Sequence, residues 1–256
     1  MNIAVHPRVE QGIGAFDGGK ITEQKPIGFS GEGSAVQRIG PLFYWAWAKA
    51  KEEGYIDSHP HQAFEILTYV INGQAHHGDS LGTKSVVGAG GAQLIQAGSG
   101  VYHNERLVGP DCELFQIWFE PSIREALRRA PAYEQHEHEE FPVVEKDGVL
   151  VKTVIGEGAP LQLVADARMW DIRLAPGAVY ERTVEKNRTV SGLAIRGSGT
   201  CVGETGRSAD FQQTDFIVIQ ADASESLAIK STADEPLWLT IVEVPTEVDY
   251  PLYPKR

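Results

Sequence analysis

Short runs rich in Val, Ile, Leu, Phe and Tyr occur along the whole chain and restrict its fold more than any other feature. Gly- and Pro-containing turns separate them, and the 27 glycines and 14 prolines are spread throughout rather than gathered in one linker. Short apolar runs closed by turn residues are typical of β-strands. Many short strands joined by tight turns form sandwiches or barrels, so we expect an all-β protein.

The expected strands fall into two groups. Turns are expected in the first group at 72–73, 79–82, 88–91 and 98–100, and in the second at 175–177, 197–199 and 233–236. The second group repeats the pattern of short strands and tight turns without repeating the sequence of the first, which predicts two tandem β-barrels. The expected strands are 64–71, 85–87, 92–96 and 114–119, and then 149–155, 169–174, 190–196, 216–220, 227–230 and 237–244.

One segment between the two groups breaks this rhythm. Residues 121–129, PSIREALRR, begin with proline and follow a helical pattern, and a polar stretch, YEQHEHEE, follows at 133–140. Polar segments of this kind commonly connect domains. We therefore expect a short helical connector, with one domain at 1–132 and a second at 133–256.

The charge of the chain argues against direct binding to nucleic acid. The net charge is −12 and the sequence pI is about 5.1. A groove that follows phosphates needs clustered Lys and Arg. The densest basic stretch, Arg124, Arg128 and Arg129, is short and has the spacing of a solvated helix face.

The chain shows no sign of secretion or membrane insertion. Its beginning, MNIAVHPRVEQG, lacks a charged segment followed by an apolar run, and no stretch approaches 18 apolar residues. Cys112 and Cys201 lie far apart and match no metal-ligand spacing, which favours two reduced, buried thiols. We expect a cytoplasmic protein with no membrane partner.

Two pairs of side chains carry the chemistry. His59 and His61 are two residues apart, and His103 and Glu105 repeat this spacing 42 residues after His61. Residues i and i+2 of a strand point to the same face, so each pair directs both side chains into one pocket. The strands between the pairs form a plausible meander that returns the chain to the same place. Three imidazoles and a carboxylate at one point predict a transition-metal site.

Such a ligand set suits Fe, Mn, Ni, Co, Cu or Zn. Four protein ligands on a six-coordinate metal leave two positions open for substrate, water or O2. All eight histidines lie at or before residue 138, so the site belongs to the first barrel.

Other polar residues receive weaker assignments. Adjacent His76 and His77 face opposite ways, so at most one of them approaches the pocket. We interpret that histidine as a contact of a metal ligand or of a neighbouring strand rather than as a ligand itself. His136 and His138 are interpreted as part of the solvated connector. Glu65 shares strand parity with the first histidine pair and either orients a ligand histidine or makes an ordinary contact between strands.

At these residues the chain resembles the pirin family of the cupin superfamily. The matching text is HPHQAFEILTYVINGQAHHGDSLG and then LIQAGSGVYHNE, over roughly residues 55–105, and it continues weakly through the connector. The resemblance implies a bicupin, in which two double-stranded β-helix barrels follow one another and the first holds the metal. It implies His59, His61, His103 and Glu105 as the ligands, usually of Fe(II).

The resemblance implies two possible functions. Some bacterial pirins look like quercetin 2,3-dioxygenases, so the first hypothesis is a dioxygenase that opens a flavonol with O2, with Glu105 as a fixed ligand or as general base. Other pirins look like metal-dependent cofactors of transcription regulators, so the second is a non-catalytic, redox-sensing iron protein that modulates a protein partner. Cupin folds host many chemistries, so another small-molecule reaction stays open.

The sequence departs from the family at two places. Gln62 stands where an arginine commonly follows HPH, which removes a positive charge near the expected mouth of the pocket. The end of the chain, EVPTEVDYPLYPKR, lacks the family's usual closing segment, so the resemblance supports no inference about a pocket in the second barrel. Because the second half contains no histidine, we expect no metal ligands there.

Overall fold

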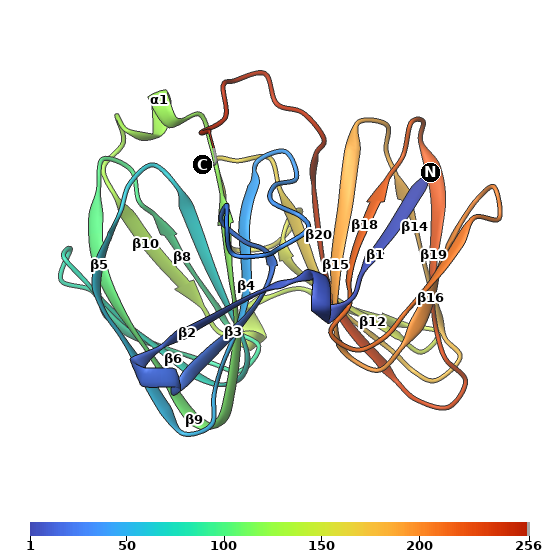
Figure 1. Cartoon of the computed structure of the whole chain (residues 1–256), viewed down its shortest axis with the longest axis horizontal. Helices are drawn as coiled ribbons and strands as arrows, with labels where there is room; N and C mark the ends of the chain where they lie inside the picture. The colour runs from blue at the N-terminus through green and yellow to red at the C-terminus, as the bar shows by residue number, and fades with distance from the viewer. Residues whose placement is uncertain (255–256) are drawn as a thin grey trace. The chain divides into compact units, whose positions relative to one another are not determined.

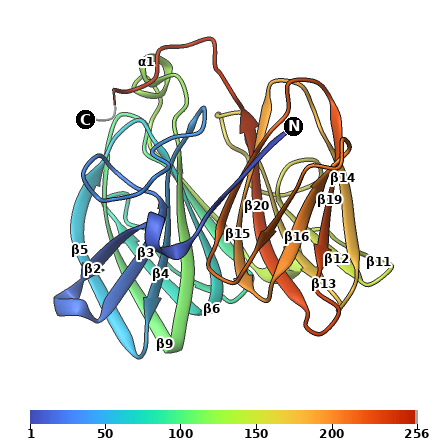
Figure 2. The same ribbon diagram turned by 45° about the vertical axis from the view of Figure 1, so that its right-hand side comes forward.

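Strands dominate the computed structural model, which describes residues 1–254. They make up 59% of the chain against 5% for helices, so the expected all-β class is confirmed. The chain divides into two units (Figures 1 and 2). The first unit contains Gln11–Phe141, Pro160–Asp166 and the described residues from 249 onward. The second unit contains Met1–Glu10, Pro142–Ala159 and Ala167–Val248.

The first unit is built on one antiparallel sheet with the strand order β10-β8-β6-β9-β4-β3-β2. In addition, β5 pairs with β9 and β7 pairs with β6. The strands are β2 (Gly12–Phe16), β3 (Ile21–Ile27), β4 (Leu42–Ala50), β5 (Glu53–His61), β6 (Glu65–Asp79), β7 (Lys84–Gly88), β8 (Ala92–Gln96), β9 (Val101–Phe119) and β10 (Ala132–His136). The helical segments are η2 (Asp17–Gly19), α1 (Ile123–Ala126) and η3 (His138–Glu140).

Strands β6 and β9 are long enough for each to pair with several neighbours, which folds the sheet around a core. Trp45, Trp47, Tyr69 and Phe115 are among the largest fully buried side chains. Strand β4, LFYWAWAKA, is buried over almost its whole length, so it reads as a continuous apolar run rather than an alternating one.

The second unit has two antiparallel sheets. Their strand orders are β1-β18-β15-β20-β13-β12-β11 and β14-β19-β16-β17, and Figure 1 shows β1, in blue, beside β18, in orange. An aliphatic core that includes Ile172, Leu239 and Ile241 lies inside the unit. The segments are β1 (Asn2–His6), η1 (Arg8–Glu10), β11 (Val143–Lys146), β12 (Val149–Ile155), β13 (Arg168–Leu174), β14 (Val179–Val184), β15 (Arg188–Arg196), β16 (Gly199–Gly203), β17 (Ser208–Phe211), β18 (Phe216–Gln220), β19 (Glu225–Ser231) and β20 (Leu237–Pro245).

The turn expected at Asn72-Gly73 is wrong, because β6 continues through these residues. The pairing of β6 with β9 shifts register there, from Asn72 opposite Glu113 to Gln74 opposite Val108. Gly73 takes a φ of 78°, which glycine adopts without strain, and the two strands bend together at a bulge. At this position the Asn-Gly pair marks a bulge rather than a hairpin.

The connector also differs from the expectation. The helix α1 is a single turn rather than the nine residues expected, since Pro131 follows closely and the chain turns back as β10. Strand β10 pairs with β8, so half of the polar stretch at 133–140 belongs to the sheet of the first unit.

The two units do not contain the same residues as the expected domains, 1–132 and 133–256. The beginning of the chain joins the second unit because β1 pairs with β18. Residues 160–166 and the described residues from 249 onward join the first unit. Among the described residues, no helix has the length and apolar character needed to span a membrane.

Candidate metal centre

Strands β5 and β9 carry the four predicted ligands side by side. His59 lies directly opposite His103 in the antiparallel ladder, and directly opposed residues point to the same face. A shift of register between Ile56 and His59 places Ile56, and not Asp57, opposite Glu105. His61 follows two residues after His59, so it points to the same side of β5.

The three predicted histidines converge. The candidate ligand atoms of His59, His61 and His103 all lie within 4.8 Å of one another. Their ring centroids form a nearly equilateral triangle, with sides of 4.4 Å between His59 and His103 and 4.8 Å for the other two pairs. The i/i+2 spacing and the cross-strand register therefore produce the cluster that the sequence predicts.

The ring nitrogens fit a metal ion. His61 Nε2 and both ring nitrogens of His103 are buried without a hydrogen-bond partner. A buried polar atom left in this state costs about 1–3 kcal/mol, and a metal bond removes that cost. His59 Nδ1 lies 2.7 Å from the carbonyl oxygen of Asp57, which leaves Nε2 as its free donor atom. His103 is completely buried and His61 is 9% exposed.

Burial also keeps the imidazoles of His61 and His103 neutral. Desolvation, with a contribution from the neighbouring histidines, lowers the pKa of His61 to about 3 and that of His103 to about 3. A neutral imidazole keeps a lone pair on one nitrogen, which is the form that binds a transition metal. The cluster therefore offers metal-binding lone pairs at neutral pH.

Glu105, the fourth predicted ligand, lies beside the histidines but is not part of their cluster. Its carboxylate contacts two polar side chains: Gln116 Nε2, farther along β9, donates to Oε2 at 2.7 Å, and Thr68 Oγ1 of β6 lies 3.5 Å from the second oxygen. Glu105 is 5% exposed. Its carboxylate is therefore held within the site, and its role as a metal ligand stays a prediction.

A cavity of about 530 Å³ opens onto the cluster. His59, His61 and Glu105 form part of its wall. Trp118 extends this wall and contacts the ring of His61 edge-on at 4.9 Å. The aromatic lining residues are Phe16, Phe29, Tyr44, Tyr55 and Trp118. An aromatic lining of this kind suits a small-molecule site.

The same cavity is strongly acidic. Five carboxylates and one ammonium group line it, namely Asp17, Glu23, Glu32, Asp57, Glu105 and Lys25. Lys25 Nζ lies 2.6 Å from Glu32 Oε1 and 3.4 Å from Glu23 Oε2. Burial outweighs the attraction of Lys25 and raises the pKa of Glu23. This wall comes from β3 and neighbouring segments, whose residues lack metal-ligand spacing and therefore give no signal of the site in the sequence.

The other polar residues singled out from the sequence take different places. Glu65 accepts hydrogen bonds from the backbone amides of Val164 and Ala165, each at 2.8 Å, so it anchors the segment 160–166. Gln62 Nε2 donates to the carbonyl oxygen of Ser99 and does not line the cavity. His136 Nδ1 lies 2.8 Å from Glu140 Oε2, in agreement with a surface position.

His76 and His77 behave as their parity predicts. His76 Nε2 lies 3.3 Å from Gln74 Oε1 on an exposed face. The His77 side chain is fully buried, and its ring centroid lies 5.5 Å from that of His103. Only His77 therefore approaches the metal cluster.

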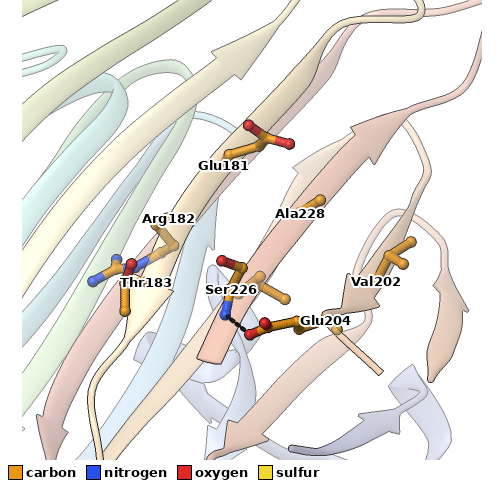
Figure 3. A pocket seen from close by; sticks show the side chains of 9 residues that line it. Glu181, Arg182, Thr183, Val202, Glu204, Ser226 and Ala228 are labelled. Carbon is orange, nitrogen blue, oxygen red and sulfur yellow. Dashed lines mark hydrogen bonds between the residues drawn. The ribbon is translucent and has the colours of Figure 1, made fainter. Parts of the chain in front are cut away.

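A second cavity, of about 450 Å³, lies in the second unit. Glu181, Ser226 and Glu204 line it, and the amide of Ser226 donates to Glu204 at 3.2 Å (Figure 3). Its lining includes no histidine or cysteine. It therefore lacks the donor set found in the first unit.

Comparison with known proteins places the chain in a family. The sequence model of the family "Pirin" matches residues 43–119, which contain all four predicted ligands. A Pseudomonas aeruginosa protein named "Putative quercetin 2,3-dioxygenase PA1210" is 31% identical over 182 residues, which are 70% of this chain and 68% of that protein. The chain belongs to the pirin family.

Other relatives support this assignment. A "Pirin-like protein" of Caulobacter vibrioides is 33% identical over 144 residues, covering 53% of this chain and 52% of that protein. The chain thus spans about half the length of this relative. The structure of the bacterial pirin YhhW from Escherichia coli in complex with nickel(II) superposes with a TM-score of 0.76 at 22% identity, over 96% of this chain and all of that one.

The pirin fold explains the two units. The predicted bicupin architecture is confirmed, with one cupin-like β unit in each part of the chain. The predicted family is confirmed as well. In this pirin the three-histidine cluster is able to hold a metal ion.

Proposed function

We propose that this pirin family member is a metal-dependent dioxygenase that opens the central ring of quercetin or a similar flavonol with O2. One observation carries the proposal. Three histidines converge at an aromatic-lined cavity of about 530 Å³, and two of them, His61 and His103, are neutral and keep buried nitrogens without partners. The name of the Pseudomonas relative supports the same reaction class.

His59, His61 and His103 would hold the metal, with Glu105 as the fourth ligand or as a base beside it. We propose Fe(II), although this donor set also accepts Mn, Ni, Co, Cu or Zn. A bound divalent ion supplies Lewis acidity toward an oxygen of the substrate. No other part of the proposal depends on which metal is present.

The protein's own groups would position the substrate and move its proton. Trp118 and Tyr44 form apolar walls that hold a flat ring system and exclude water. Glu105 would accept the proton of the substrate hydroxyl, since its carboxylate lines the cavity. Gln116, which donates to Glu105 at 2.7 Å, keeps that carboxylate in place during the transfer.

The overall reaction balances without a further reductant. Both oxygen atoms of O2 enter the products, two carbon–carbon bonds of the flavonol ring break, and one carbon leaves as CO. The substrate is thus a neutral aromatic molecule with adjacent enol and carbonyl oxygens, and O2 is the co-substrate.

The test is aerobic incubation of protein loaded with each candidate metal. We expect loss of the flavonol absorption band together with one CO for each flavonol consumed. A matched preparation of His61→Ala, which lacks one donor of the cluster, should show neither. Stoichiometric metal binding without flavonol turnover for any metal would refute the substrate. It would then favour the metal-dependent binding protein that modulates a partner.

A further inference from the structure

A buried pair, His77 and Asp79, lies behind the candidate metal centre. Both residues are on β6, which pairs with β9 along this stretch. Asp79 is directly opposite His103, and His77 is directly opposite Glu105. The four side chains therefore occupy one face of two neighbouring strands, so that the pair adjoins two of the predicted ligands.

The hydrogen bond within the pair fixes which nitrogen of His77 carries a proton. His77 Nε2 lies 2.9 Å from Asp79 Oδ2, and the two side chains are 0% and 1% exposed. An ionised carboxylate only accepts hydrogen bonds, so Nε2 must donate. Burial alone would raise the pKa of Asp79, but hydrogen bonds from His77, Thr83 and Leu81 outweigh it and lower that pKa. A neutral His77 then presents Nδ1 as an acceptor.

That acceptor has no partner in the structure, and neither do the ring nitrogens of His103. When one nitrogen of a histidine binds metal, the other normally donates its N–H to an acceptor that orients the ring. His59 has such an acceptor in the carbonyl of Asp57. His103 has none among the described residues, although it is completely buried.

The spacing of the two rings suits a direct bond. The centroids of His77 and His103 are 5.5 Å apart, with an angle of 43° between the planes. An N–H···N bond of ordinary length between two imidazoles places their centroids about 5.3 Å apart. The orphan nitrogen of His77 is thus within reach of His103 after a small rotation.

The ring of His77 is held firmly on its other side. Tyr133, from β10, stacks on it at 4.4 Å with only 16° between the planes. The Tyr133 hydroxyl in turn lies 3.0 Å from Gln93 Oε1 and contacts Ser85 Oγ. Stacking against an anchored ring limits rotation of His77 out of its plane.

We propose that His77, oriented by Asp79 and Tyr133, is the positioning residue for His103. In the metal-bound site it accepts a hydrogen bond from the ring nitrogen of His103 that does not bind the metal. The result is a chain of hydrogen bonds running Asp79–His77–His103. The proposal rests on the proposed metal centre, and it assigns a function to a motif, HGDS, that carries no ligand.

Asp79→Asn tests the direction of this chain. The Asp79 Oδ1 accepts from the amides of Leu81 at 2.9 Å and Thr83 at 3.0 Å, so an asparagine oxygen must stay there. Its amide group then faces His77 Nε2 and donates to it, which moves the proton of His77 to Nδ1. The acceptor for His103 is lost while the turn is kept.

The measurement is the affinity for Ni(II) or Co(II) alone, by chelator competition, together with the Co(II) visible spectrum. We expect Asp79→Asn to bind 10- to 100-fold more weakly, at about the level typical of lost outer-shell partners, and to shift the Co(II) bands. His76→Gln is the matched control, because its side chain lies on the opposite face of the same strand, and it should bind as the parent protein does.

Two further variants separate positioning from packing. His77→Phe keeps the ring that stacks on Tyr133 but removes the acceptor, so it should show the same loss of affinity. His77→Gln keeps an acceptor oxygen and should recover part of the affinity. Parent-like affinity and Co(II) bands in His77→Phe would overturn the proposal while leaving the metal centre intact. A parent protein that binds neither metal would instead overturn the metal centre.

Discussion

The interiors of the two units hold opposite kinds of polar cluster. In the first unit, three histidines converge, and two of them, His61 and His103, leave buried nitrogens without partners. In the second unit, the buried carboxylate of Glu243 forms ion pairs with three arginines, Arg168, Arg182 and Arg188. The first cluster keeps ring nitrogens that can bind a metal, whereas the second joins a buried carboxylate to guanidinium groups.

The arginine cluster ties the two sheets of the second unit together. Glu243 is on β20 and is 2% exposed, while Arg182 reaches it from β14 in the other sheet. Arg188 Nε lies 3.0 Å from Glu243 Oε1. The guanidinium of Arg182 also lies over the ring of Trp170 at 4.3 Å.

Chemistry separates the two clusters as clearly as geometry does. A guanidinium keeps its proton at any pH that a protein survives, so it offers no lone pair to a metal. The one histidine of the second unit, His6, is paired with Glu10 at 2.9 Å near the surface. One fold thus supports a binding site in one unit and a structural ion-pair cluster in the other.

The largest effect is expected from breaking the arginine cluster. Glu243→Gln leaves buried arginine charge without its counter-ion, and removal of one partner from a buried pair costs about 3–5 kcal/mol. Urea unfolding should show this loss while metal content stays unchanged. Glu181→Gln, at an exposed position of the same unit, should unfold as the parent does. A loss of metal in Glu243→Gln would show that the two clusters are coupled.

The rates at which the two buried thiols react should differ between the units and should depend on pH. Burial raises the pKa of Cys201, in the second unit, to about 12, and it also raises the pKa of Cys112, in the first. The thiolate is the reactive form of cysteine, and a raised pKa lowers the fraction of thiolate at a given pH. Cys201 at pH 8 should therefore react roughly 1000-fold more slowly than a free thiol.

The rate for Cys201 should rise about tenfold for each pH unit while the protein stays folded. Disulfide exchange with a chromogenic reagent, with mass spectrometry of the products, measures both sites. Hydrogen bonds with the backbone of Gln74 and Val108 offset part of the rise in the Cys112 pKa that burial causes. Cys112 should therefore react before Cys201. Faster reaction of Cys201 would contradict its burial in an aliphatic core.

Loss of one histidine should affect only the first unit. His61→Ala removes one of three convergent donors, and we expect metal affinity to fall at least about 100-fold, the upper range for a lost outer-shell partner. Circular dichroism should be unchanged. His138→Ala, in the segment after β10, is the control. Full metal retention in His61→Ala would refute the ligand assignment.

The smallest effect concerns the charge of the ligand. The acidic cavity should bind a neutral flavonol better than its sulfonated, anionic derivative. Glu23→Gln should reduce the ratio of the two affinities, neutral over anionic, about fivefold, because the interaction between two unit charges at contact distance in water is worth about 1 kcal/mol. Titration of metal-free protein with both ligands measures this ratio, and Glu10→Gln is the control. An unchanged ratio would mean that Glu23 does not sense the bound ligand.

Local signals were enough to predict the histidine cluster and ten of the twenty strands among the described residues. Parity along β5 and β9 needs only sequence spacing, so His59, His61 and His103 were found directly. The bulge at Gly73 was missed because it depends on how β9 bends opposite it. The acidic wall containing Glu23 and the ion pairs of Glu243 were missed because they bring together strands that are distant in sequence and share no motif.

Strand β1 cannot pair during synthesis until its partner, β18, has been made. About 210 residues separate the end of β1 from the start of its partner. At ribosomal speeds of about 5–20 residues per second, the first strand waits roughly 10 to 40 s before its partner exists. During that time its backbone is an open edge on which a second nascent chain could pair. An open edge of this kind favours association between chains while they are still being made.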